Sequence, residues 1–249
     1  MTLCQLLDWD SRFFGQRIAR ITPGRLTQAE MPAITDWCRA NKIDCLYLLA
    51  DADDYETVCQ ASRNGFYLVD VRITFANDRL SGSAQTVESG GNALRRFRPD
   101  DLPALKEIAG RLHTDSRFFF DPHFSPARSR AMFEIWIETS CLNRDGAVFV
   151  AERQQKPVGY VACGIGKDQA GQIELLGVDT PAQGAGLGRR LVNAALEWFA
   201  ANRVARVSVV TQGRNVAAQR LYQTCGFTTE SLQIWYHRWL QSGSDQSKA

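Results

Sequence analysis

Short apolar runs bounded by turn residues recur along the second half of the chain and predict strands. Runs that alternate, or that are rich in β-branched residues, are typical of half-buried or buried strands. The predicted strands cover residues 93–99, 147–153, 158–165, 172–178, 206–211 and 230–240. The second and third of these flank the turn "QQKP" at 154–157, so we expect them to lie side by side.

Apolar residues at helical spacing predict helices between these strands. The predicted helices run from Asp100 or Asp101 to residue 112, over 126–140, over 187–201 and from Asn215 to Gly226. Asn215 and either aspartate can cap a first turn, and Gly226 suits a C-terminal stop. The mixture of strands and helices places this half of the chain in the α/β or α+β class.

The first half of the chain weakly repeats part of the second half, and we refer to this internal repeat as the echo. Residues 37–50 can be laid over 198–211, and the same shift of 161 residues places Gly65 over Gly226. This echo predicts that residues 1–78 form a smaller α/β half-domain. Residues 24–34 stand where the second half has a glycine-rich segment, so we expect the half-domain to pack and not to bind a cofactor.

Composition shifts suggest where the domains end. Residues 79–93 are polar and rich in Ser and Gly, which predicts a linker or long loop. The polar residues 241–249 are typical of a disordered tail. The remaining chain is then an N-terminal domain over 1–78 and a larger domain over 94–240.

The overall composition excludes several classes of protein. The chain has 249 residues, is 45% hydrophobic and 22% charged, and carries a net charge of +2, which gives no general attraction to nucleic acid or to a membrane surface. We see no signal-peptide pattern and no apolar stretch of the roughly 20 residues that span a bilayer. Seven cysteines without a C-x-x-C pair, and no His/Cys cluster with metal-ligand spacing, predict reduced thiols in a cytoplasmic protein without a metal.

The segment "TPAQGAGLGRR" at 180–190 has three glycines and joins a predicted strand to the first turn of a predicted helix. Free N–H groups and the positive end of the helix dipole meet there, so the segment can bind a phosphate; a plain glycine-rich turn is the alternative. No Lys-Ser or Lys-Thr pair follows the glycines, which disfavours a nucleoside-triphosphate loop. Arg189 stands where a dinucleotide fingerprint needs its third glycine.

Two motifs together resemble the GCN5-related N-acetyltransferase (GNAT) superfamily. A strand ending in "LLGV" meets Gln183-x-x-Gly186-x-Gly188, and further on stands Asn215-x-x-Ala218-x-x-x-Tyr222-x-x-x-Gly226-Phe227. The resemblance covers residues 93–240. It implies a mixed central sheet splayed by a bulge, helices on both faces of that sheet, and acetyl-CoA as the co-substrate.

The resemblance also implies how acetyl-CoA is held. The glycine-rich segment would bind its diphosphate, and the end of the preceding strand would bind the pantetheine arm and polarise the thioester carbonyl through main-chain groups. Gly177 at this point suits a bulge. The implied cofactor-binding residues are Leu176, Gly177, Val178, Gln183, Gly184, Ala185, Gly186, Leu187, Gly188, Arg189, Asn215 and Ala218.

Two side chains are predicted to move protons. Tyr222 matches the family tyrosine that protonates the departing thiolate, with a core aromatic as the alternative. Glu174 is the first candidate for the base that deprotonates the ammonium acceptor, because alternation along a strand places it on the side of Leu176 and Val178. A solvated carboxylate is the alternative for Glu174. His237 is the rival base, and the other two histidines are interpreted as structural.

Short matches spread along the chain are similar to members of this superfamily that acetylate nucleotide-linked 4-amino-4,6-dideoxy sugars. They are "FFG" (13–15), "SRF" (116–118), "WIE" (136–138) and "RLYQTCGF" (220–227). Arg117 would contact the diphosphate of such an acceptor, and aromatic residues beside it would flank the sugar or base unless they belong to the core. The implied acceptor-binding residues are Arg117, Phe118, Asp121, Glu138 and His237.

These patterns predict an N-acetyltransferase that moves acetyl from acetyl-CoA to the amino group of a nucleotide-linked amino sugar by direct attack. Acetylation of a protein N-terminus or lysine is one alternative, and a non-catalytic acyl-CoA sensor is another. Bulky aromatics between 113 and 126 disfavour a peptide groove, and Tyr222 disfavours a sensor. A homodimer, formed through the last strand or the extra domain, is implied by the resemblance.

Overall fold

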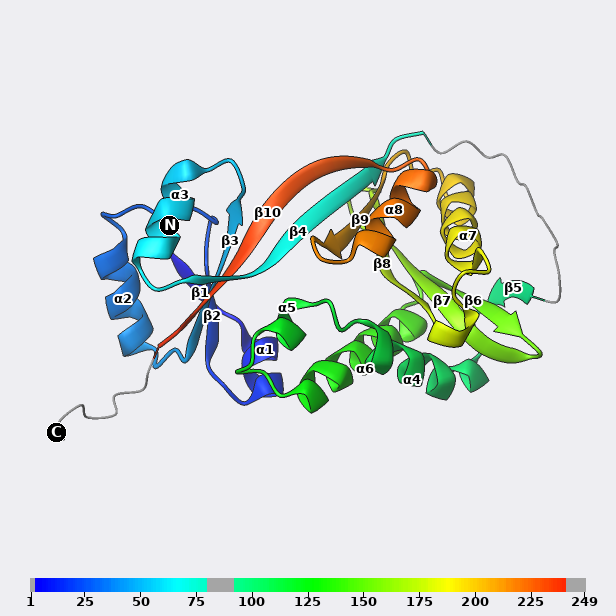
Figure 1. Cartoon of the computed structure of the whole chain (residues 1–249), viewed down its shortest axis with the longest axis horizontal. Coiled ribbons are helices and arrows are strands. Elements are labelled where there is room, and N and C mark those ends of the chain that lie inside the picture. The colour runs from blue at the N-terminus through cyan, green and yellow to red at the C-terminus, as the bar shows by residue number, and fades with distance from the viewer. Residues whose placement is uncertain (1–2, 80–91, 241–249) are drawn as a thin grey trace. The chain divides into compact units, whose positions relative to one another are not determined.

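The computed structural model describes residues 3–79 and 92–240, which divide into two compact units (Figure 1). Unit 1 contains the chain up to residue 72, the short segment 120–124 and the chain from residue 232, whereas unit 2 contains 73–119 and 125–231. Most of the predicted linker and the whole predicted tail lie outside the described residues. The domain boundaries at 78 and 94 stay a prediction, since each unit is built from separate stretches of chain.

Unit 1 is a mixed sheet with helices. Its elements are β1 (Cys4–Leu6), α1 (Asp8–Phe14), β2 (Ile18–Ile21), α2 (Met31–Ala40), β3 (Cys45–Asp51), α3 (Tyr55–Arg63), the first half of β4 (Tyr67–Asn77) and the second half of β10 (Thr228–Trp239). Its strands follow the order β1-β2-β3-β10-β4. β2 and β3 are parallel, whereas β1 with β2 and β3 with β10 are antiparallel.

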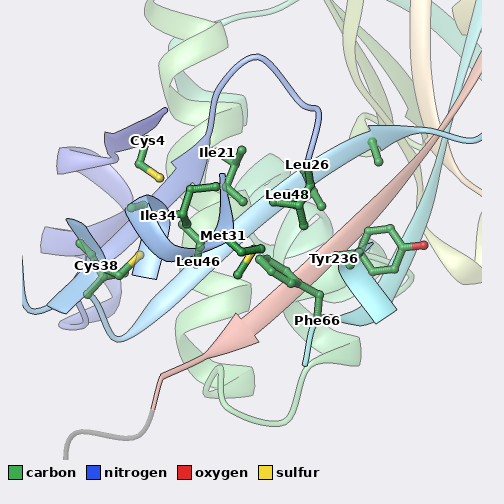
Figure 2. Close-up of a cluster of buried hydrophobic side chains, with 14 residues drawn as sticks. Cys4, Ile21, Leu26, Met31, Ile34, Cys38, Leu46, Leu48, Phe66 and Tyr236 are labelled. Carbon is green, nitrogen blue, oxygen red and sulfur yellow. The ribbon is translucent and has the colours of Figure 1, made fainter. Parts of the chain in front are cut away.

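The core of unit 1 is formed by side chains of α2, α3, β2 and β3 (Figure 2). Strand β3 is buried along nearly its whole length because it lies between β2 and β10, and its unbroken apolar run fits such a central position. Met31, Ile34 and Cys38 are spaced three and four residues apart, so they share the buried face of α2. All seven cysteines of the chain are free thiols.

Unit 2 likewise contains parallel and antiparallel strands together with helices. Its elements are the second half of β4, β5 (Asn92–Arg96), the 3-10 turn η1 (Pro99–Asp101), α4 (Leu102–Leu112), most of α5 (Arg117–Phe120), α6 (Pro126–Leu142), β6 (Ala147–Arg153), β7 (Lys156–Ile165), β8 (Gly171–Val178), the 3-10 turn η2 (Thr180–Ala182), α7 (Leu187–Ala201), β9 (Val207–Gln212), α8 (Val216–Thr224) and the start of β10. Its strands follow the order β4-β9-β8-β7-β6-β5. β8 and β9 are parallel, and β5 to β8 pair in antiparallel fashion.

Helices cover both faces of this sheet, as expected. A Cβ added to Gly177 would lie 3.1 Å from Leu112 of α4, and one added to Gly171 would lie 2.8 Å from Phe199 of α7. The β7 partners of these glycines are Tyr160 and Ile165, an odd number of residues apart, so the two glycines face opposite sides. The expected α/β class and the predicted strands and helices of this half are confirmed, with shifts of a few residues at their ends. The short helices α1 and α5 were not predicted.

Of the helix caps predicted at Asn215 and Asp101, the structure confirms the one at Asn215. Asn215 caps α8 as predicted, because its side chain accepts a hydrogen bond from the Ala218 N–H at 3.0 Å. Asp101 occupies the first position before α4, but its carboxylate accepts from the Arg98 N–H and from the Arg95 guanidinium, each at 2.7 Å. The ion pair with Arg95 therefore replaces the expected bond to the first turn of α4.

The internal echo extends to the boundaries of the elements. The same shift of 161 residues maps both ends of α3 onto the ends of α8, and the start of β4 onto the start of β10. Asp54 caps α3 by accepting from the Thr57 N–H at 3.1 Å, just as Asn215 caps α8. In unit 1, β3 has β10 as its neighbour, and in unit 2, β9 has β4 as its neighbour. The last strand of each copy of the echo therefore lies beside a strand of the other copy.

Unit 1 also contains a buried carboxylate that collects hydrogen bonds from several side chains. Asp121 lies 2.6 Å from Nδ1 of His237 and 2.9 Å from Nε1 of Trp239. The Tyr67 hydroxyl donates to it at 3.0 Å, and Nδ1 of His123 lies 2.8 Å away. Burial alone would raise the pKa of Asp121, but the hydrogen bonds from His237, Trp239 and His123 outweigh burial and hold this pKa below its usual value. The ionised carboxylate therefore anchors the segment 120–124 within unit 1.

We predict that Asp121→Asn lowers the free energy of unfolding by about 3 kcal/mol at pH 7, because buried donors lose an ionised acceptor. The folded pKa of Asp121 is depressed, so its stabilisation is present above about pH 4, the ordinary pKa of aspartate, and is lost as the pH falls through the folded value. Urea unfolding at pH 7 and at pH 3 should therefore show the largest gap between variant and wild type at pH 7. Asp53→Asn, at an exposed position, is the control; an equal loss in both variants would contradict the anchoring role.

Candidate active site

Strand β8 carries one residue more than its partner β7. Ala162 pairs with Leu175 and Cys163 pairs with Ile173, which leaves Glu174 as a bulge. On its other edge, β8 pairs with β9 over Gly171–Ile173, and the two strands separate beyond that point. The predicted splayed strand is therefore present, but its bulge lies at Glu174 and not at Gly177.

Gly177 is needed for a different reason, the close approach of two side chains. A Cβ at this position would lie 3.0 Å from the ring of Tyr160 and 3.1 Å from Leu112. The aromatic ring therefore lies against the backbone of the splayed half of β8. Only glycine allows a contact this close.

The glycine-rich segment forms the turn that begins helix α7. Gly186 precedes the helix with φ of 73° and Gly184 has φ of 80°, a backbone conformation that favours glycine. The side chain of Gln183 donates to the Val178 carbonyl at 2.9 Å, which ties the segment to the end of β8. Gly188 faces α8, where a Cβ would lie 3.1 Å from Leu221.

The main-chain N–H groups of this segment are available to a ligand. Within the described residues, none of the amides of 184–189 donates to another main-chain carbonyl; the first such bond runs from Arg190 N–H to Gly186 at 3.2 Å. These amides belong to the positive end of α7, and the exposed Arg189 adds a positive charge. The segment therefore has the chemistry of a diphosphate site.

Tyr222 lies on α8, which begins at the Asn215 cap. It is buried, with its ring centroid 6.1 Å from that of Phe75 and 5.9 Å from that of Phe227. Burial raises the pKa of the Tyr222 hydroxyl, so the phenol keeps its proton. This hydroxyl has no hydrogen bond to any residue that the structure describes, and it is not among the completely buried polar atoms without a partner. Its oxygen is therefore not completely buried and is available as a donor.

The position of Glu174 corrects the expectation from strand alternation. Its carboxylate accepts a hydrogen bond from the Ser140 hydroxyl of α6 at 2.8 Å, and a Cβ built on Gly164 would meet its Oε1. Gly164 and Tyr160 are on the same face of β7, so Glu174 lies on the face covered by α4 and α6. Because the bulge reverses the alternation, Leu176 points to the opposite face.

The predicted acceptor-binding residues lie in different surroundings. Arg117 stacks over the ring of Phe118 at 4.3 Å, but Phe118 itself is buried. Glu138 on α6 forms an ion pair with Lys106 on α4 at 2.7 Å. Asp121 and His237 are completely buried and bonded to each other within unit 1. In this conformation neither reaches solvent, which disfavours direct contact with an acceptor and makes His237 a poor rival to Glu174.

One pair of side chains was missed by the sequence analysis. His113 was interpreted as structural, but its Nε2 lies 2.8 Å from the hydroxyl of Tyr160, the residue that packs on Gly177. Burial lowers the pKa of His113 to about 4. The spacing of the two residues carries no motif: the β7–β8 register places Tyr160 beside Gly177, and the end of α4 places His113 against Tyr160.

Neither a metal site nor a membrane span is found in the described ranges 3–79 and 92–240. No group of three or more His, Cys, Asp or Glu side chains there could hold a metal ion. No helix in the same ranges is long and apolar enough to cross a membrane.

Comparison with known proteins places this arrangement in a family. Residues 110–227 match the model of the acetyltransferase (GNAT) family. The chain is 26% identical over 242 residues to dTDP-fucosamine acetyltransferase of Escherichia coli O6:H1, covering 93% of this chain and 96% of that protein. It is 30% identical over 141 residues to the spore coat polysaccharide biosynthesis protein SpsD of Bacillus subtilis, covering 57% of this chain but 48% of that protein.

Solved structures show the same fold. A GCN5-related N-acetyltransferase from Sphaerobacter thermophilus superposes with a TM-score of 0.64 at 16% identity, covering 99% of this chain and 79% of that one. Residues 110–227 therefore belong to the acetyltransferase (GNAT) family, whose members use acetyl-CoA, and the solved structure shows the same fold. Within it, a likeness to dTDP-fucosamine acetyltransferase runs through nearly the whole chain, whereas the likeness to SpsD spans about half of that protein's length.

Proposed function

We propose that this protein transfers acetyl from acetyl-CoA to the amino group of a nucleotide-linked 4-amino-4,6-dideoxy sugar by direct attack. The observation behind this proposal is that β8 ends its pairing with β9 after Ile173, and that the amides of residues 184–189, which follow β8, are available to a ligand. The likeness to dTDP-fucosamine acetyltransferase over 93% of the chain supports the choice of acceptor. The homodimer and the cytoplasmic location predicted from the sequence stay predictions.

In this proposal the residues of the glycine-rich segment hold the diphosphate of acetyl-CoA. Main-chain N–H groups at the start of a helix bind such an anion, and Arg189 adds charge. The pantetheine arm then lies along residues 175–178, whose main-chain groups face the gap left by β9. An N–H group in that gap can stabilise the oxyanion that forms when the amine attacks the thioester carbonyl.

Tyr222 is the proposed acid for the departing thiolate. Its hydroxyl is protonated and lacks a protein acceptor among the described residues, so it is free to donate to sulfur. The rings of Phe75 and Phe227 beside it are apolar, and a thiolate that leaves in apolar surroundings needs a proton donor. Asn215 and Ala218 precede it on α8 and would line the same side of the cofactor.

Glu174 is the proposed base. The hydrogen bond from Ser140 fixes its carboxylate on the α4/α6 face, next to the splayed residues of β8. Its exposure lets it take a proton from the ammonium group, directly or through water, and release it to solvent. Arg117, held against Phe118, is the proposed contact for the diphosphate of the nucleotide sugar.

The direct test is incubation of the protein with acetyl-CoA and dTDP-4-amino-4,6-dideoxygalactose, with mass spectrometry of the sugar and measurement of released thiol. We expect an acetylated sugar and one thiol per product. Tyr222→Phe should lower kcat about 100-fold through loss of the acid, with little change in the Kd of acetyl-CoA. Tyr236→Phe, at another buried tyrosine, is the matched control. Coenzyme A binding without turnover on any amino sugar would favour the sensor, and acetylation of peptides alone would favour the protein acetyltransferase.

A pair of glycines separates loss of coenzyme A binding from loss of stability. Gly186 and Gly15 have φ of 73° and 72°, and a Cβ at either meets nothing within 4 Å. Alanine should therefore strain both equally, by roughly 1–2 kcal/mol. We expect Gly186→Ala to raise the Kd of coenzyme A about 10-fold or more in isothermal titration calorimetry, and Gly15→Ala to leave it unchanged. Equal affinities in the two variants would count against the proposed diphosphate site.

A further inference from the structure

His113 and Tyr160 form a bonded pair that the transfer scheme above leaves unused. Tyr160 is completely buried on β7 and pairs with Gly177 in the β7–β8 register. His113 directly follows α4, and its Nε2 lies 2.8 Å from the Tyr160 hydroxyl oxygen. Its ring stacks on Phe133 of α6, with the ring centroids 4.6 Å apart. Contacts with α6 and β7 therefore hold the imidazole in one orientation.

The burial of Tyr160 decides which nitrogen of His113 carries the proton. Burial raises the pKa of Tyr160, so the phenol stays protonated. Among the described residues, the hydroxyl has Nε2 of His113 as its hydrogen-bond partner, and a buried O–H without an acceptor is strongly disfavoured. The phenol therefore donates to Nε2, and the proton of the neutral imidazole lies on Nδ1.

The other nitrogen, Nδ1, is directed to a surface. It has no hydrogen bond to a described residue, and it is not among the completely buried polar atoms that lack one, so solvent or a ligand can reach it. His113 is the first residue of the connection from α4 to α5, which leads to Arg117. The ring of Tyr160 links it to Gly177, since a Cβ there would lie 3.0 Å from that ring.

The charge state of His113 suits an amine acceptor. Burial lowers its pKa to about 4, so the ring is uncharged near neutral pH, and desolvation is the cause of this shift. The groups packed on the ring, Phe133 and the protonated Tyr160, carry no charge. An uncharged donor does not repel an arriving ammonium group, as an imidazolium would.

We infer that His113 is an acceptor-binding residue whose Nδ1–H donates a hydrogen bond to an uncharged oxygen of the acceptor, such as a hydroxyl on the carbon next to the amine. This inference rests on the proposed function and deepens it. The site then prefers amines with a neighbouring hydroxyl, because the analogue without that hydroxyl leaves the fixed donor unpaired.

The test uses two substitutions of His113, each of which keeps the hydrogen-bonding role of one ring nitrogen and removes that of the other. His113→Asn keeps a donor near the position of Nδ1 and loses the partner of Tyr160, whereas His113→Gln keeps a partner near Nε2 and loses the outer donor. With dTDP-4-amino-4,6-dideoxygalactose, we expect His113→Gln to lower kcat/KM about 10-fold and His113→Asn to lower it less. The Kd of acetyl-CoA should stay within about 2-fold of wild type in both.

The second part of the test uses the same sugar without its 3-hydroxyl as the acceptor. Wild type should lose about 10-fold in kcat/KM on this analogue, and His113→Gln should show no further loss. Equal rates of wild type on the two sugars would overturn the inference. The reverse order of the variants, with His113→Asn the more damaged, would also overturn it, because His113 would then merely support Tyr160.

One measurement on the free wild-type protein needs neither the variants nor turnover. The ¹⁵N chemical shifts of the His113 ring should report the Nδ1–H tautomer at pH 7, and an Nε2–H tautomer or an imidazolium would overturn the inference. If no amino sugar is acetylated by wild type, the proposed function fails. The tautomer still decides whether the donor exists as inferred.

Discussion

The parting of β8 from β9 after Ile173 is the constraint on which the rest of the site depends. Parallel pairing of the two strands covers Gly171–Ile173, and the bulge at Glu174 bends β8 away where that pairing ends. Main-chain groups that would otherwise be satisfied within the sheet are then available to a ligand. The proposed thioester site lies in that opening, and the proposed base is the bulged residue itself.

The opening is held in place by its surroundings and not by β8 alone. On one face, Tyr160 and Leu112 pack against the backbone at Gly177. At the far end, the Gln183 side chain donates to the Val178 carbonyl and ties the glycine-rich segment to the strand. The amides at the start of α7 follow directly after this tie. Such fixed dipoles need no rearrangement when charge develops, which is why they suit acyl transfer.

The sequence predicted the local features well, because they depend on short-range chemistry. Asn215 as a cap, the start of α7 at the glycine-rich segment, and the strand before it all follow from residue types and spacing. The bulge was misplaced, since a glycine in a strand can serve either a bulge or a close approach, and here Gly177 serves the second. Glu174 was consequently assigned to the wrong face of β8.

Long-range pairings could not be predicted from the sequence. The burial of Asp121 beside His237 depends on the pairing of β10 with β3 in unit 1, and no local sequence pattern predicts that pairing. The same holds for His113, whose partner Tyr160 is a distant residue in an ordinary strand. In both pairs a residue outside the sheet packs against a strand that is far away in the chain, and local sequence patterns do not determine such packing.

Amide hydrogen exchange of residues 184–189 tests the central claim most directly. Coenzyme A, which carries a diphosphate, should slow exchange of these amides, whereas pantetheine, which lacks one, should leave them unchanged while protecting 175–178. Coenzyme A that binds without protecting 184–189, or pantetheine that protects them equally, would contradict the account.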